Sequence, residues 1–189
     1  MALINPIVGP DHWLSKVRRN PSSNYHDRKS AIALLVIHGI SLPQGRFGTG
    51  FTEDLFCNRL DITAHPSFRS LEGSRVSTHL LISRWGKVTQ FVPFDKSAWH
   101  AGQSSYGGRT LCNDFSVGIE LEGTDDREYT DRQYIQLMCV VKAILRAYPS
   151  IGIRSIVGHN EIAPGRKTDP GPLFDWPRLY RSLTRVQLS

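Results

Sequence analysis

Two histidines stand where they could act together on one ligand. His38 closes the apolar run that begins at Ala31, and His159 follows a shorter apolar run at residues 154–157. A loop is expected after each of them, so both imidazoles can reach the same rim of a β-sheet. Neutral imidazole is the commonest metal ligand among protein side chains. The pair therefore indicates a metal site.

The segment after His159 contains a third candidate ligand. It reads GHNEIAPGRKTDPG and is rich in glycine and proline, which is typical of a rigid irregular loop. Such a loop can return Asp169 to His159. Two imidazoles and one carboxylate suit Zn²⁺, and three protein ligands leave a fourth position for water, as in catalytic zinc sites. Other interpretations stay open at this point, because Asp169 could initiate a turn with Pro170 and Lys167 could be a solvated loop charge.

The other five histidines are expected to be structural. His12 and His26 lie in a polar N-terminal stretch, and His65 precedes a proline in a loop. His79 falls within a predicted strand and His100 within a loop, and for both we favour structural hydrogen bonding over a place among the metal ligands.

The strands that must position these groups are visible as β-rich runs. Residues 31–40, AIALLVIHGI, predict a strand buried on both faces. Further strands are predicted at residues 76–82, 87–92, 115–121 and 154–157. The first two of these would pair antiparallel through a short connection. The third would carry Glu120 near its end.

The clearest helical pattern begins at Thr130. Thr130 and Gln133 have the spacing of a capping box, Pro149 ends the pattern, and apolar residues between them recur at steps of three and four. Weaker helices are predicted at residues 11–19, 52–60 and 175–183, the last with Asp175 as N-cap. Strands mixed with helices predict an α/β fold: a single domain over residues 1–189, core about 30–183, with a mixed sheet flanked by helices and the zinc site at one rim.

The composition favours a single-domain protein without a membrane span or a disulfide framework. A chain of 189 residues suits one domain, and no segment approaches the roughly 20 apolar residues that a membrane span needs. The N-terminus has no basic segment before an apolar run, so we expect a cytoplasmic protein. Three widely spaced cysteines, Cys57, Cys112 and Cys139, argue against a disulfide framework.

The net charge of +6 raises the possibility of nucleic-acid binding. The excess of lysine and arginine lies at the two ends of the chain, and no basic stripe is interleaved with aromatic residues. We therefore expect neither a nucleic-acid nor a membrane partner, and a monomer. The charge would instead aid solubility or attract an acidic ligand.

Five blocks of the sequence resemble one enzyme family. LLVIHGISLP, RVSTHLLI, FVPFDKSAWHAG, CNDFSVGIELEGTD and GHNEIAPGRKTDPG run in order from about Ser30 to Trp176 and are similar to blocks of the zinc-dependent N-acetylmuramoyl-L-alanine amidases. The insertion SLPQGRFGTGFTEDLFCNRLD most resembles the cytoplasmic members that act in cell-wall recycling. The resemblance implies hydrolysis of the bond between anhydro-N-acetylmuramic acid and L-alanine in muropeptides.

The resemblance also implies roles for individual residues. It makes His38, His159 and Asp169 the zinc ligands, Glu120 the acid/base group and Lys167 a cation beside the metal. Glu120 would accept a proton from the attacking water and protonate the leaving nitrogen, while Lys167 would stabilise the developing oxyanion. No organic cofactor is implied.

The substrate contacts are predicted on weaker grounds. Arg75 and Arg109 could pair with carboxylates of the stem peptide, and Trp99 could stack on the sugar. Members of this family commonly have asparagine after the first histidine, where this chain has Gly39. This departure concerns substrate preference more than the reaction.

Three other functions are weighed against the amidase. Glu120 and Glu122 would share a strand face, as in a paired-carboxylate glycosidase, but that leaves the convergent histidines unexplained. A peptidoglycan-recognition module would keep the fold and only bind, and such members lack a complete metal site. A nucleic-acid binder rests on the isoelectric point of about 9.5 and would show strongly salt-dependent binding.

Overall fold

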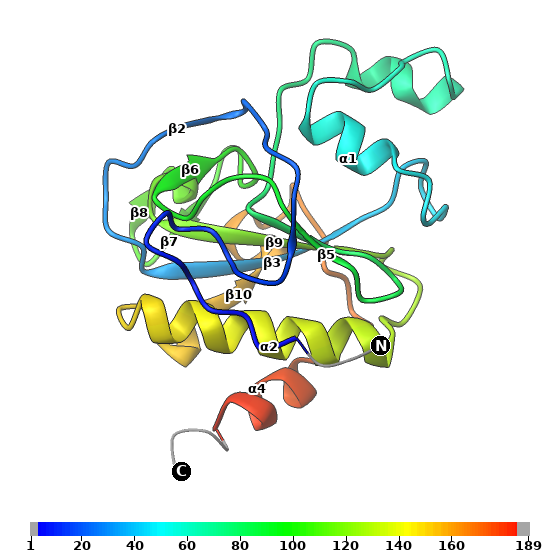
Figure 1. Cartoon of the computed structure of the whole chain (residues 1–189). Helices are drawn as coiled ribbons and strands as arrows, with labels where there is room; N and C mark the ends of the chain where they lie inside the picture. The colour runs from blue at the N-terminus through cyan, green and yellow to red at the C-terminus, as the bar shows by residue number, and fades with distance from the viewer. Residues whose placement is uncertain (1–3, 185–189) are drawn as a thin grey trace.

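A six-stranded mixed sheet forms the centre of the computed structural model, which describes residues 4–184 (Figure 1). The strand order is β1-β5-β4-β9-β3-β10, and only the β4–β5 pair is antiparallel. Its strands are β1 (Arg18–Arg19), β3 (Leu34–Ile40), β4 (Leu80–Ile82), β5 (Val88–Gln90), β9 (Ser116–Glu122) and β10 (Ile156–Gly158). Two small antiparallel pairs lie outside this sheet: β2 (Tyr25–Asp27) with β6 (Lys96–Ala98), and β7 (Ser105–Tyr106) with β8 (Arg109–Thr110).

The helices are α1 (Phe51–Phe56), α2 (Asp131–Ala147), α3 (His159–Ile162) and α4 (Trp176–Thr184), with short 3-10 helices at Pro66–Leu71, Cys112–Asp114 and Ile153–Ser155. The predicted α/β class and the mixed sheet are therefore confirmed. Among the described residues, no helix combines the length and apolarity needed to cross a membrane.

The central strands β3 and β9 bring His38 and Glu120 side by side. They pair in parallel register over seven residues, and His38 is the direct partner of Glu120. Alternating side chains point to opposite faces of a strand, so His38 and Glu120 leave the sheet on one face while Ile37 and Ile119 enter the core on the other. The strand predicted over residues 31–40 is confirmed, although it begins at Leu34; it ends at Ile40, as predicted.

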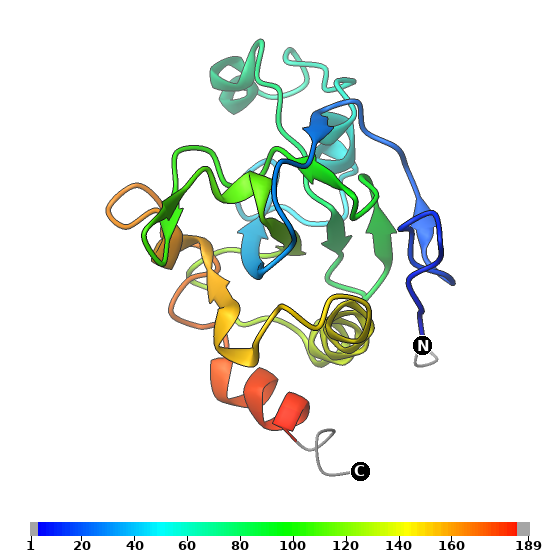
Figure 2. The same cartoon turned by 90° about the vertical axis from the view of Figure 1, so that its left-hand side faces the viewer.

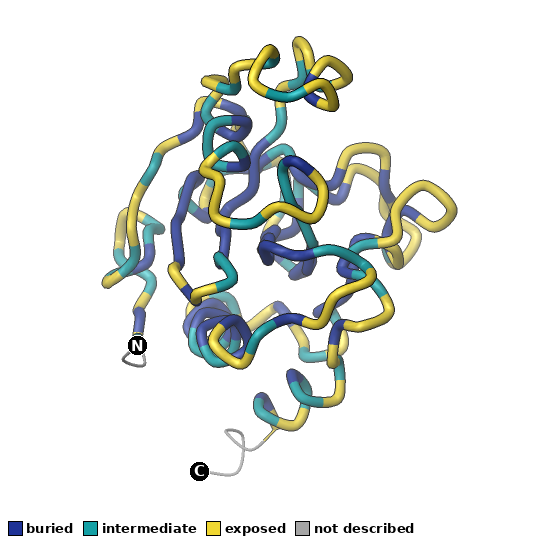
Figure 3. Tube along the Cα trace, turned by 90° about the vertical axis from the view of Figure 1, so that its right-hand side faces the viewer, coloured by how far each residue is buried: buried dark blue, intermediate teal, exposed yellow. Residues whose placement is uncertain are grey.

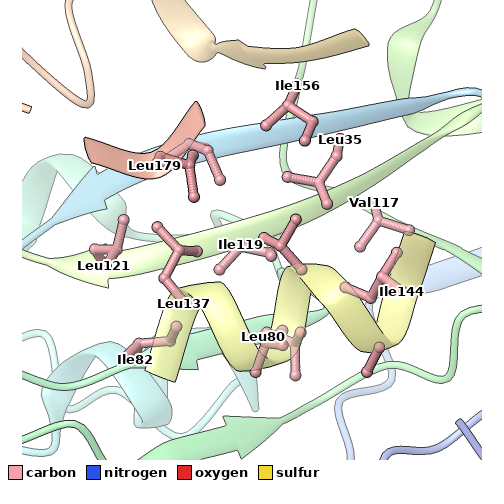
Figure 4. Close-up of a cluster of buried hydrophobic side chains, with 14 of the residues drawn as sticks. Leu35, Leu80, Ile82, Val117, Ile119, Leu121, Leu137, Ile144, Ile156 and Leu179 are labelled. Atoms are coloured by element: carbon pink, nitrogen blue, oxygen red, sulfur yellow. The ribbon is translucent and has the colours of Figure 1, made fainter. Parts of the chain in front are cut away.

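Helix α2 covers the core face of the sheet. Its buried residues Leu137 and Ile144 pack with Ile119 and other strand residues (Figure 4). Figure 2 shows α2 end-on beneath the strands, with α4 on its outer side. The capping box is confirmed, since the Gln133 N–H donates to Thr130 Oγ1 at 3.2 Å and the Thr130 N–H donates to Gln133 Oε1 at 3.0 Å. Such a cap stabilises a helix by about 1 kcal/mol.

The weaker helical predictions have different outcomes. Helix α4 is confirmed with its cap, since the Arg178 N–H donates to Asp175 Oδ1 at 2.9 Å. Helix α1 ends at Phe56 instead of residue 60, and Asn58 has a φ of 56° that does not continue a helix.

The helix predicted over residues 11–19 is wrong. His12 and Lys16 have φ values of 59° and 60°, and Arg18–Arg19 pairs with β5 as an edge strand. The Leu14 N–H donates to the Gln90 side chain at 2.7 Å, so this backbone is satisfied by the sheet instead of by a helix. Tertiary pairing here overrides a weak local pattern.

The strand that leads to His159 begins later than predicted. Residues Ile153–Ser155 form a 3-10 turn, and the strand β10 is limited to Ile156–Gly158. His159 begins α3, where a loop had been predicted. The short strand still ends beside β3, because Gly158 pairs with Ile37. Figure 3 shows the buried strands surrounded by exposed loops.

Candidate metal centre and active site

Three predicted ligands converge on one point beside the sheet. The Nδ1 atoms of His38 and His159 lie 3.0 Å apart, and Asp169 Oδ2 lies 3.2 Å from each of them. Both histidines are buried and the carboxylate is half-buried. The structure therefore brings together the same three residues that the sequence had singled out.

The chemistry and spacing of this cluster fit a metal ion. A tetrahedral zinc with ligand bonds of about 2.0–2.1 Å holds its donor atoms about 3.3 Å apart, close to the separations found here. Burial lowers the pKa of His38 to about 4, so its imidazole is neutral at physiological pH and has a lone pair to offer. Burial alone would raise the pKa of Asp169, but the two facing imidazoles hold it well below its ordinary value, so this carboxylate is ionised. Two imidazole nitrogens and one carboxylate oxygen form a donor set suited to zinc.

Asp169 reaches the cluster because its loop is held by the backbone at both ends. The N–H groups of Arg166 and Lys167 donate to the Ala163 carbonyl, and the Asn160 N–H donates to the Asp169 carbonyl at 3.0 Å. The buried Tyr129 hydroxyl donates to the Pro170 carbonyl at 2.9 Å. These bonds confirm that the loop returns Asp169 to His159.

Glu120 lies beside the cluster with an unpaired carboxylate oxygen. Its Oε1 is 3.9 Å from His38 Nδ1, and its buried Oε2 has no hydrogen-bond partner within the described part of the chain. Burial raises the pKa of Glu120 well above its ordinary value, and the negative charge of Asp169 raises it further. A carboxyl group in this setting takes up a proton more readily than an ordinary glutamate does, which suits a group that must accept and then release one.

Lys167 lies at the edge of a groove that opens onto the cluster. The groove has a volume of ≈ 330 Å³, at the lower end of the range of small-ligand pockets. Its lining combines the end of β3 and the loop after it, the loop after β9, and the Asp169 loop: Gly39, Ile40, Ser41, Gln44, Gly123, Thr124, Asp125, Arg166, Lys167, Thr168 and Asp169. The exposed Lys167 side chain is near enough to Glu120 for its charge to favour the ionised carboxylate.

Each histidine of the cluster also contacts a neighbouring group through its Nε2 atom. His159 Nε2 lies 3.2 Å from the Ala101 carbonyl, and His38 Nε2 lies 2.9 Å from His100 Nδ1. Structural hydrogen bonding was predicted for His100 and is found, but its contact with His38 was not foreseen. The two residues are 62 positions apart, and no spacing pattern in the sequence signals their contact.

The remaining histidines have the structural roles expected of them. His79 is buried, accepts the Gly118 N–H at Nδ1 and lies 3.0 Å from the Lys96 carbonyl at Nε2. His12 contacts Tyr148, and His65 caps a 3-10 helix. His26 lies against Asp114 and accepts a hydrogen bond from a tryptophan indole.

Glu122 is part of the scaffold. One of its oxygens accepts the Gly48 N–H and the other accepts the Arg84 N–H at 3.0 Å. The residue therefore anchors the loop before α1 and the β4–β5 turn, and both of its oxygens are occupied. This arrangement leaves Glu122 unavailable as the second carboxylate of a glycosidase.

The three predicted substrate contacts lie away from the groove lining. Arg75 is exposed and lines a separate pocket of ≈ 190 Å³. Trp99 donates from its indole to His26 Nδ1 at 2.9 Å, and the Arg109 guanidinium stacks 3.8 Å from the Phe115 ring centroid. Their roles in binding stay predictions.

The packing around Gly39 leaves no room for a side chain. A Cβ atom at this position would lie 2.3 Å from the Tyr129 hydroxyl oxygen and 3.5 Å from Pro170 Cα. A larger residue would require Tyr129, which bonds to the Asp169 loop, to move. The glycine thus leaves room for the Tyr129 hydroxyl next to His38.

The sequence and the fold are similar to those of characterised amidases. The family model for N-acetylmuramoyl-L-alanine amidase matches residues 28–172. The 1,6-anhydro-N-acetylmuramyl-L-alanine amidase AmpD of Salmonella typhimurium (strain SL1344) is 53% identical over 176 residues, which cover 92% of this chain and 93% of that protein.

Two solved structures extend the comparison. A crystal structure of a selenomethionine AmpD derivative has a TM-score of 0.89 and 52% identity, and covers 91% of this chain and 97% of its own. The E. coli amidase AmiD, in complex with the substrate anhydro-N-acetylmuramic acid-L-Ala-D-γ-Glu-L-Lys, has a TM-score of 0.60 and 28% identity, and covers 94% of this chain and 65% of its own.

Proposed function

Because this chain belongs to the N-acetylmuramoyl-L-alanine amidase family, we propose that it is a zinc-dependent enzyme that hydrolyses the amide bond between 1,6-anhydro-N-acetylmuramic acid and L-alanine. The observation that carries the proposal is the cluster of His38, His159 and Asp169 with the unpaired Glu120 carboxyl beside it. The AmpD relatives, which are about half identical over most of their length, support the choice of substrate.

His38, His159 and Asp169 would hold the zinc ion. The chemistry that zinc supplies at such a site is polarisation of the substrate carbonyl and a lowered pKa for water. The other steps belong to side chains of this protein.

Glu120 would move the proton in the reaction. Its carboxylate accepts a proton from the attacking water as the water oxygen adds to the lactyl carbonyl carbon. It then delivers that proton to the L-alanine nitrogen as the carbon–nitrogen bond breaks, so the products are a free lactyl carboxylate and a free amino terminus. The raised pKa of Glu120 suits this alternation between the two protonation states.

Lys167 would stabilise the negative charge that grows on the former carbonyl oxygen. Its ammonium group is exposed at the groove edge and can approach that oxygen without first breaking an ion pair found among the described residues. A positive group that acts on developing charge raises the rate of the chemical step more than it tightens substrate binding.

We assign the reaction to the cytoplasm and to the recycling of peptidoglycan, with a monomer as the active form. The similarity to the AmpD relatives supports this assignment. Cell fractionation tests the compartment, and size-exclusion chromatography with light scattering tests the oligomeric state.

The deciding experiment measures metal content and hydrolysis on the same preparation. We expect about one zinc per chain and release of free tripeptide from anhydro-N-acetylmuramoyl tripeptide, with loss of release after a chelator and recovery after added zinc. The matched substrate with an intact N-acetylmuramic acid measures the strictness for the anhydro sugar.

The principal alternative predicts a different result. A peptidoglycan-recognition module would bind the muropeptide and leave it intact with or without added zinc. That outcome in the presence of fully zinc-loaded protein would replace the amidase by a binding function.

A further inference from the structure

A chain of hydrogen bonds leads from the metal cluster into the interior of the protein. His38 Nε2 lies 2.9 Å from His100 Nδ1, and His100 Nε2 lies 3.1 Å from Ser116 Oγ. Ser116 Oγ lies 2.6 Å from the Cys112 carbonyl oxygen. All four groups are buried, so each link lacks competition from bulk water.

The Cys112 carbonyl oxygen, at the end of this series of hydrogen bonds, determines where each of its protons lies. A carbonyl oxygen can only accept, so at 2.6 Å the Ser116 hydroxyl must donate to Cys112. The Ser116 oxygen is then free to accept the Nε2–H of His100. A neutral His100 with its proton on Nε2 has a lone pair on Nδ1, which accepts the Nε2–H of His38.

The consequence appears at the metal cluster. A neutral His38 with its proton on Nε2 has its lone pair on Nδ1, the atom that faces His159 and Asp169. The opposite tautomer would place a hydrogen in the position where a metal ion must bind.

The backbone around His100 holds its ring in place. An ideal Cβ on Gly118 would lie 2.5 Å from His100 Cγ, so the ring packs directly on β9 where only glycine leaves room. The Asn113 side-chain oxygen accepts the N–H groups of His100 and Ala101 at 3.1 and 2.8 Å. The same segment supplies the Ala101 carbonyl that His159 contacts.

We propose that His100 and Ser116 are positioning residues, which hold His38 in the Nε2–H tautomer with its Nδ1 lone pair turned toward the metal. The proposal rests on the proposed zinc site, and it adds His100 and the Ser116 hydroxyl to the groups that support the metal ligands. Partners of this kind set the tautomer and orientation of a ligand histidine, and their loss typically weakens metal affinity about 10–100-fold.

The test compares variants of similar size. His100→Asn keeps an acceptor near the position of Nδ1, whereas His100→Leu has nearly the same shape and no acceptor. Ser116→Ala removes the distant hydroxyl without touching a metal ligand. Thr78→Val is the control. Thr78 Oγ1 is a buried hydroxyl that donates to the Gly118 carbonyl of β9 at 2.9 Å, and it takes no part in the hydrogen bonds between His38 and Cys112.

Zinc affinity is measured by competition with a chromophoric chelator on folded protein, as judged by circular dichroism. We expect His100→Leu and Ser116→Ala to bind zinc about 10–100-fold more weakly than the wild type. His100→Asn should recover much of the loss, and Thr78→Val should bind as the wild type does. Wild-type affinity in both His100→Leu and Ser116→Ala would overturn the proposal.

Nitrogen-15 NMR of the metal-free protein reads the tautomer of His38 directly. We expect the proton on Nε2 in the wild type and a mixture of tautomers in Ser116→Ala, a readout that remains decisive if His100→Leu does not fold. A wild-type His38 with its proton on Nδ1 would refute the inference. A wild type that binds no zinc would refute the proposed function, while the NMR spectra would still decide the tautomer.

Discussion

Replacing Glu120 by glutamine should make the metal-free protein more stable while it abolishes most of the activity. Glu120 is 8% exposed, its Oε2 has no partner among the described residues, and the Asp169 carboxylate lies close enough to raise its pKa. The scaffold therefore holds a carboxyl group in a place that disfavours its charge. Natural proteins commonly keep such costly groups where the reaction needs them.

The size of the gain follows from the buried charge. Glutamine leaves a polar atom in the same place but removes the charge, whose burial costs about 1.4 kcal/mol for each unit by which the folded-state pKa exceeds its ordinary value, so Glu120→Gln should raise the free energy of unfolding by at least about 1 kcal/mol near pH 8. The pKa of Glu120 is raised in the folded state, so the folded protein binds the proton more tightly than the unfolded chain does. The destabilisation by Glu120 therefore grows as the pH rises above the ordinary value of 4.5 and disappears below it.

The assay is urea unfolding of chelator-treated protein at several pH values, beside zinc content and hydrolysis of the zinc-loaded protein. Hydrolysis should fall about 10²–10⁴-fold, the usual contribution of a general acid/base, while zinc content stays near that of the wild type. A Glu120→Gln protein that is less stable than the wild type at pH 8 would refute the reasoning about burial. Undiminished hydrolysis would refute the assigned role.

Glu122→Gln is the matched control, because Glu122 lies on the same strand and is equally buried. Both of its oxygens accept backbone N–H groups, whereas a glutamine would turn an NH₂ group toward one of those donors. We expect this substitution to destabilise the protein by about 1–3 kcal/mol. The two glutamates should thus respond in opposite directions to the same chemical change.

Three further predictions concern the ligands, the cation and a buried histidine. His159→Ala and Asp169→Ala should each lose zinc and hydrolysis together, and retained zinc in either one would undo the ligand assignment. Lys167→Ala should lower kcat about 10²–10³-fold with little change in KM, and Lys167→Arg should restore part of the rate, as steady-state kinetics on zinc-loaded protein will show. Burial holds the pKa of His79 well below its ordinary value of 6.5, so the unfolded chain takes up a proton that the folded protein does not, and stability is lost as the pH falls through that value. From pH 7 to pH 5 this costs the wild type up to about 2 kcal/mol, which His79→Asn should not lose in urea titrations of metal-free protein; equal losses in both would contradict the prediction.

Local pattern was sufficient to predict the elements that carry the site. The β-branched run before His38 buries side chains on both faces, and a strand buried in this way has few alternative conformations. The helix α2 combines a capping box with one apolar stripe, so local bonds and burial favour the same structure. The two histidines and Asp169 could be grouped because metal chemistry restricts which residue types can share a site.

Local pattern failed where pairing with distant segments decided the structure. Residues 11–19 contain a weak helical periodicity, but the edge of β5 satisfies the backbone of Arg18–Arg19 and the side chain of Gln90 binds Leu14. Such contacts join residues more than 70 positions apart, and nothing in the local sequence encodes them.

The sequence by itself determined the central strands and the long helix and singled out the three residues that converge beside the sheet, because burial and coordination chemistry act through residue type. Only the tertiary structure decided which group contacts the other ring nitrogen of His38 and of His159. The register of β3 against β9 sets His38 opposite Glu120, and the close packing on Gly118 seats His100 behind His38. The same register separates the roles of two similar carboxylates: Glu120 faces the metal cluster unpaired, while Glu122 is held by backbone N–H groups. Hydrogen-bond partners depend on where the whole chain places each atom, and residue type alone does not specify that placement.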